Sequence, residues 1–239
     1  DKDNYKWLFD KHEKRFLNIE GLYKFDGEKF EKFKYDLEVN DKTKKNKLTI
    51  NFMPAINLSF LNYNKKAGIT ANMTSEFQIS KDSIDISKFE YAENKSTISL
   101  KDISLNKNFQ LKKISNILIK TFKNKKENNN FKIVFSDKII INGNKYDATN
   151  LIRQINKKSK NSFLKKINKR LEIKLDTIIT TYPEPLNGFS LFGQIKKGKL
   201  VKILSKSEFS NNKFLDIILK KDQNTNKKLL EVYSDLPEP

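Results

Sequence analysis

Residues 33–39 read Phe-Lys-Tyr-Asp-Leu-Glu-Val, in which apolar and charged side chains alternate without interruption. Successive side chains of a β-strand point to opposite faces, so this stretch predicts a strand with one apolar and one wetted face. Shortly before it, Tyr23 and Phe25 precede Asp26-Gly27, a pair favoured in two-residue hairpin turns. The stretch therefore predicts the beginning of an antiparallel sheet.

The same alternation continues along the chain. Turn-forming pieces such as Pro54 and residues 62–68 separate the alternating segments. Strands joined by such short turns predict a large antiparallel meander. The alternating apolar positions are Leu48, Ile50, Phe52, Ile56, Leu58, Phe60, Ile69, Ala71, Met73, Phe77, Ile79, Ile84, Ile86, Ile98, Leu100, Ile103, Leu105, Phe131, Ile133, Phe135, Ile139, Ile141, Leu171, Ile173 and Leu175.

Four segments show helical spacing instead. Apolar residues three and four positions apart predict an amphipathic N-terminal helix over Asp3–Leu17 and a further helix over Ile114–Phe122. Two more helical segments are expected around Leu151–Ile155 and Phe163–Ile167. The predicted fold class is α+β: a large curled antiparallel sheet, half-barrel-like, with an N-terminal helix and two or three further helices on one side. Residues 1–239 are expected to form a single domain, with the charged stretch 123–130 as the one candidate seam.

The composition is strongly basic. Lys and Arg number 48 against 29 Asp and Glu, for a net charge of +19, and only three of the basic residues are Arg. The Lys excess and the run Asn128-Asn129-Asn130 are interpreted as typical of a low-GC genome. Because Arg is preferred for bidentate phosphate and base contacts, the Lys excess argues against specific nucleic-acid recognition. The net charge still predicts attraction to polyanions and to anionic membrane surfaces.

The usual enzyme signatures are absent. The chain has no Cys, which excludes a disulfide, a thiolate zinc site and a Cys nucleophile. Its one His, His12, lies beside the apolar side of the predicted N-terminal helix, where a packing role is expected. No glycine motif for phosphate binding occurs, and the alternating acids Asp36 and Glu38 are interpreted as the wetted side of a strand. The sequence predicts no enzyme, no catalytic residue, no cofactor and no metal.

Two groups of residues are candidate binding sites. The first is a set of apolar side chains on the inward phases of the predicted strands, which would line either a cavity for acyl chains or an ordinary packed core. Its members are Phe33, Tyr35, Phe52, Leu58, Phe60, Phe77, Phe131, Phe135 and Phe189. The second is a Lys-rich stretch without acidic residues, which would be either an anion site or a solvated helix face. Its members are Lys157, Lys158, Lys160, Lys165, Lys166, Lys169 and Arg170.

The opening of the chain carries a family resemblance. The residues concerned are Trp7, His12, Phe16, Ile19, Leu22 and Gly27. This helix leading into a meander resembles the start of LolB-type outer-membrane lipoproteins, and the later element order is similar to the LolA/LolB architecture. The resemblance implies a curved half-barrel, covered by helices, that receives the acyl chains of lipoproteins.

The composition also looks like that of lipoproteins from low-GC spirochaetes. A Cys-free chain that starts at Asp1 suits export after signal cleavage. The expected function is therefore an exported, membrane-anchored lipoprotein that binds acyl chains of lipids or lipoproteins and acts in trafficking to the outer membrane. The expected location is the periplasm or the outer membrane, with the cell surface as a further option. The alternative is a cell-surface adhesin that binds polyanions such as sulfated glycans through the Lys-rich stretch.

Overall fold

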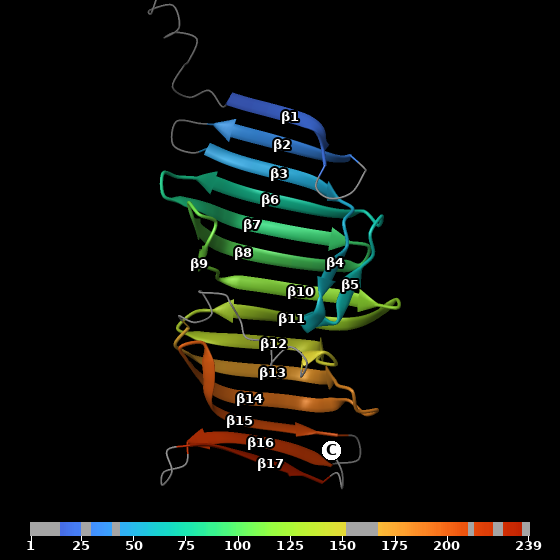
Figure 1. The fold of residues 1–239 in the computed structure, drawn as a ribbon, viewed down its shortest axis with the longest axis vertical. Coiled ribbons are helices and arrows are strands. Elements are labelled where there is room, and N and C mark those ends of the chain that lie inside the picture. Colours follow the sequence, from blue (N-terminus) through green and yellow to red (C-terminus); the bar gives the residue numbers. More distant parts are fainter. Residues whose placement is uncertain are drawn as a thin grey trace, which may run out of the picture.

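The computed structural model of the chain describes residues 15–24, 30–39, 44–151, 167–209, 213–221 and 227–235. One 15-stranded sheet has the order β1-β2-β3-β6-β7-β8-β10-β11-β12-β13-β14-β15-β16-β17, with β9 paired to β8. Strands β1 and β17 lie at opposite ends of this open sheet (Figure 1). The elements are β1 (Arg15–Tyr23), β2 (Glu31–Val39), β3 (Lys44–Phe52), β4 (Ile56–Leu58), η1 (Ser59–Leu61), β5 (Tyr63–Lys65), β6 (Ala71–Ile79), β7 (Ser83–Glu93), β8 (Ser96–Asn106), β9 (Leu111–Lys113), β10 (Asn116–Lys123), β11 (Lys126–Phe135), β12 (Lys138–Asp147), β13 (Lys169–Ile179), β14 (Leu186–Lys196), β15 (Lys199–Glu208), β16 (Phe214–Lys221) and β17 (Lys228–Ser234).

The predicted antiparallel sheet is confirmed. Neighbouring strands of the main sheet pair antiparallel, with the exception of β12 and β13, which run parallel and place Ile139 opposite Leu171. A parallel pair cannot be joined by a tight hairpin and needs a crossover connection. Residues 152–166 of that connection lie outside the described residues. The candidate seam at 123–130 is the hairpin between β10 and β11, within the same sheet.

The predicted α+β class is wrong, while the two helical segments expected around Leu151–Ile155 and Phe163–Ile167 lie almost wholly outside the described residues. Residues 15–17 of the expected N-terminal helix belong to β1, and residues 1–14 lie outside the described residues. The expected helix over Ile114–Phe122 is largely strand β10. There Ile117, Ile119 and Thr121 alternate on one face, and β-branched residues favour this pleated surface. Across the described ranges, no helix is longer than the single 3-10 turn η1. Over the residues that the structure describes, the protein is nearly all β, without the helical cover expected for a half-barrel.

One face of the sheet is apolar along a row that crosses the strands in register. Directly opposed residues of neighbouring strands place their side chains on the same face. The row consists of Ile50, Met73, Tyr91, Ile98, Ile119, Phe131, Gly143, Leu175 and Phe189. We call this side the apolar face. The row on the other side begins Thr49, Thr74, Glu90, Ser99, and we call that side the polar face.

A short excursion of the chain covers the middle of the apolar face. Strand β4, turn η1 and strand β5 form a separate two-stranded hairpin, here called the flap, which crosses in front of the sheet (Figure 1). Leu61 and Tyr63 of the flap are 1% and 3% exposed and belong to one cluster with Tyr91, Ile119 and Phe131 of the sheet. The alternation at Ile56–Phe60 predicts a strand of the main sheet, but these residues belong to the flap that covers the core.

A buried polar network ties the flap to the sheet. The side-chain amide of Asn129, which is 0% exposed, donates to the Leu61 carbonyl at 2.7 Å and to Thr121 Oγ1 at 2.8 Å. Asn129 Oδ1 accepts from the Asp147 backbone N–H at 2.9 Å. Asn62 of the flap donates to Asp147 Oδ2 at 2.8 Å. The asparagine run interpreted as genome composition therefore contains a structural residue, since buried polar groups must be paired.

Two ionisable side chains of the flap are also buried. Lys65, 1% exposed, donates to the carbonyls of Met53 at 3.0 Å and Pro54 at 2.6 Å. Burial lowers the pKa of Lys65 below its ordinary value. The Tyr63 hydroxyl lies 2.6 Å from the Tyr91 hydroxyl, and burial raises the pKa of Tyr63 far above its ordinary value. Lys65 thus joins the end of the flap to the segment that leads into it, and Tyr63 joins the flap to β7.

Candidate functional site

The apolar residues predicted to line a cavity are mostly on one side of the sheet. Phe33, Tyr35, Phe52, Phe77, Phe131, Phe135 and Phe189 all fall on the apolar face by their strand register. Leu58 and Phe60 belong to the flap, where Phe60 is 49% exposed. The predicted inward phases thus identified a common face.

The pockets in the described part of the chain do not gather this set. One groove, of about 950 Å³, crosses β1, β2, β3 and β6 to β9, and Phe77 is the one member of the set that lines it. A second groove of about 500 Å³ includes Phe33. Most of the side chains that line these grooves belong to the polar face.

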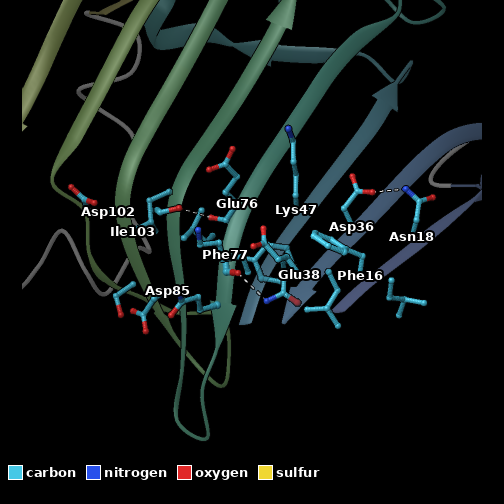
Figure 2. Close-up of a pocket in the computed structure, with 18 of the residues that line it drawn as sticks. Phe16, Asn18, Asp36, Glu38, Lys47, Glu76, Phe77, Asp85, Asp102 and Ile103 are labelled. Atoms are coloured by element: carbon cyan, nitrogen blue, oxygen red, sulfur yellow. Dashed lines mark hydrogen bonds between the residues drawn. The ribbon is translucent and has the colours of Figure 1, made fainter. Parts of the chain in front are cut away.

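The larger groove is rich in carboxylates. Figure 2 shows Asp36, Glu38, Glu76, Asp85 and Asp102 along it, together with Lys47. Hydrogen bonds from Ser104 and Ser83 lower the pKa of the Asp85 carboxyl. No group of three or more His, Asp or Glu among the described residues is arranged to hold a metal ion. The groove is therefore a charged surface feature of the N-terminal half.

The C-terminal half of the polar face has a different character. Here the row that starts at Thr49 continues through Leu118 as Lys132, Asn142, Lys174, Ser190 and Lys206, on five adjacent strands. We call these five residues the lysine row. Its three lysines are exposed, and among the described residues none of them has an ion pair or a hydrogen bond. The row contains hydrogen-bonding groups and positive charge, and no acidic residue.

The Lys-rich stretch predicted as an anion site is described only at its end. Lys157, Lys158, Lys160, Lys165 and Lys166 lie outside the described residues. Lys169 donates to the Ser136 carbonyl, and Arg170 pairs with Asp137 at 3.5 Å. These two residues hold the start of β13 against the β11–β12 turn.

Sequence reasoning missed the lysine row because its members lie on separate strands. Each lysine alone looks like the wetted position of an alternating segment. Only the strand order and register, including the parallel β12–β13 pair, bring the three together. A signal was nevertheless present, since Lys132 and Lys174 both stand between apolar residues of strand segments.

Comparison with known proteins found no matching family model, no matching curated protein and no matching solved structure. Within the described residues, no helix has the length and apolar character needed to cross a membrane. The fold and site define the molecule as an open β-sheet protein with a flap-covered apolar face and a cationic polar face.

Proposed function

We propose that the protein is an interaction module that binds a linear polyanion, of the sulfated glycan class, along the lysine row. The observation that carries this proposal is the register that aligns Lys132, Lys174 and Lys206 on one exposed face. The proposal retains the polyanion binding expected of an adhesin. It places the polyanion on the sheet, whereas the sequence alone placed it at residues 157–170.

The spacing of the row suits an extended chain. Adjacent strands lie about 4.8 Å apart, so lysines on every second strand stand about 10 Å apart, and the row spans about 19 Å. Asn142 and Ser190 fill the intervening positions and offer neutral hydrogen-bonding groups. A flexible ammonium group contacts a sulfate as a point charge, which tolerates variation in the position of successive sulfates.

Carboxylates border the row, among them Asp176 beside Lys174 and Asp216 opposite Lys206, but within the described residues none of them forms an ion pair with a lysine of the row. Glu172 also lies beside the row on β13, but both of its carboxylate oxygens accept from Lys138 Nζ at 2.8 Å. The row ends at Leu118 on one side and at Asp216 on the other. The net charge of +19 adds long-range attraction that brings a polyanion to this face.

Replacing Lys132, Lys174 and Lys206 together with Gln should weaken heparin binding about tenfold or more at 50 mM salt. The slope of log affinity against log salt should become shallower by about 2 to 3, because each neutralised charge contributes about 0.9 to that slope for a polyanion as dense as B-DNA. Titration of a fluorescent heparin oligosaccharide across a salt series measures both quantities.

The matched control is Lys66, Lys81 and Lys107 to Gln, three exposed turn lysines whose loss changes the net charge equally. This control should retain most of the affinity. Equal losses of heparin affinity in the two triple variants would show that the binding depends on net charge alone, and would reject the lysine row as the site.

A second candidate function is the binding of apolar chains on the apolar face, in an exported lipoprotein engaged in lipid or lipoprotein trafficking. The row of large apolar side chains from Ile50 to Phe189 favours it, since many of its members are only half-buried. The protein purified natively and extracted with organic solvent should then release fatty acid or phospholipid at about one per chain, measured by mass spectrometry. A chain free of lipid after native purification would reject this candidate.

A further inference from the structure

Among the described strands, β1 and β17 form the two edges of the sheet, and both carry exposed apolar side chains. On β1, Phe16, Leu17, Ile19 and Leu22 are 74%, 48%, 43% and 62% exposed. An edge strand presents unpaired backbone N–H and C=O groups that can pair with another strand. Each end of the sheet therefore has both the backbone and the side chains for strand addition.

Strand β1 is complementary to itself. If two copies pair antiparallel over the whole strand, residue positions 15–23 overlap completely with Ile19 at the centre. Ile19 then faces Ile19 of the second copy, Phe16 faces Leu22, and Leu17 faces Gly21. Asn18 faces Glu20, an amide against a carboxylate. Every apolar residue meets an apolar residue or a glycine, and no like charges are opposed.

Glycine at position 21 suits this arrangement. A Cβ at Gly21 would lie 2.8 Å from Cε1 of Phe33, so the Phe33 ring packs over the glycine, in the space that a larger side chain would take. Leu17 of a second copy, placed opposite Gly21, would pack in the space beside that ring.

The opposite edge lacks this complementarity. The same full-length pairing of β17 would place Glu231 at the centre, directly opposite Glu231 of the second copy. Like charges in directly opposed positions destabilise a strand pair. The Glu231 carboxylate is already paired with Lys220 at 2.7 Å on the neighbouring strand.

We propose that two copies of this chain associate through β1, by antiparallel pairing centred on Ile19, into one continuous sheet with a two-fold axis perpendicular to it. This symmetry keeps both apolar faces on one side and both lysine rows on the other. The inference does not depend on what the lysine row binds.

Cysteine cross-linking tests the register directly, because the chain has no Cys of its own. In an antiparallel pair, opposed Cα atoms are about 4.5 to 5.5 Å apart, within the range that a disulfide bridges. The variant Ile19→Cys of the full chain should form a covalent dimer under mild oxidation. Leu118→Cys, 57% exposed in mid-sheet against 43% for Ile19, should form no covalent dimer, and neither should Glu231→Cys at the centre of β17.

The mass in solution gives a second readout. Light scattering should give about twice the chain mass of 28.1 kDa for the unmodified protein at high concentration. Ile19→Lys, which opposes two lysines on the two-fold axis, should return the mass to that of one chain, whereas Leu118→Lys should not. A monomer at all concentrations, or cross-linking of Glu231→Cys in place of Ile19→Cys, would overturn the proposal.

Discussion

Gly143→Ala should be the most destabilising small substitution in the sheet, with a loss of about 3 kcal/mol or more of unfolding free energy. Gly143 lies on β12 opposite Phe131, where the register slips by one residue. A Cβ at this position would lie 2.3 Å from the Asn130 carbonyl oxygen and 2.4 Å from Phe131 Cα. Both are backbone atoms of β11, so the clash can be relieved only by moving a central strand.

Urea unfolding followed by far-UV circular dichroism measures this loss. Gly21→Ala is the matched control, because the atom its Cβ would meet belongs to the Phe33 ring, which can rotate away. The control should cost less than about 1 kcal/mol. A Gly143→Ala protein as stable as the Gly21→Ala protein would contradict the packing of β12 against β11.

Asn129→Ala should lower the unfolding free energy by about 3 kcal/mol. The substitution leaves the Leu61 carbonyl and the Asp147 N–H without their partner, and each unpaired buried group costs about 1 to 3 kcal/mol. Asn128 also donates to the Leu61 carbonyl, at 3.3 Å, and offsets part of the loss. Because Leu61 belongs to the flap, proteolytic cleavage near residues 56–65 should also become faster.

The control for this prediction is Asn72→Ala, an exposed position on the polar face of β6. Its unfolding free energy should change by no more than about 0.5 kcal/mol. Equal stability of the Asn129→Ala and Asn72→Ala proteins would show that the amide network does not hold the flap.

The strand pattern of this chain was predictable where one side of a strand is apolar and the other charged. Residues 33–39 and Leu48–Phe52 alternate in this way and form β2 and β3. Such segments satisfy the period of two with little ambiguity. Tyr182-Pro183-Glu184-Pro185, whose two prolines cannot donate to a strand ladder, falls between β13 and β14.

Prediction failed where apolar residues occur on both sides of a strand. In β10, Leu118 is 57% exposed on the polar face while Ile117 and Ile119 lie on the apolar face. Three consecutive apolar residues also fit a helical spacing, so the pattern could not decide between the two. The flap was missed for a related reason, since Ile56 and Leu58 alternate like a sheet strand but pair only with β5.

For the candidate site, the sequence indicated the class of ligand but not the position of the residues that would bind it. The excess of Lys indicated a polyanion partner, and the sequence located it in the densest run, 157–170. The density of positive charge along the sequence does not predict its density on the sheet surface. Lysines such as Lys132 and Lys206 lie in one row only because their strands pair in this order and register. The apolar set was easier to predict from the sequence, because side chains at alternate positions of a strand lie on the same face of the sheet.

Footprinting of lysine acetylation on the full chain, with and without a heparin oligosaccharide at low salt, tests directly whether a polyanion binds along the lysine row. Bound heparin should slow the modification of Lys132, Lys174 and Lys206 several-fold and leave the modification of Lys66, Lys81 and Lys107 unchanged. Uniform protection of all lysines, or protection confined to residues 157–170, would contradict binding along the lysine row.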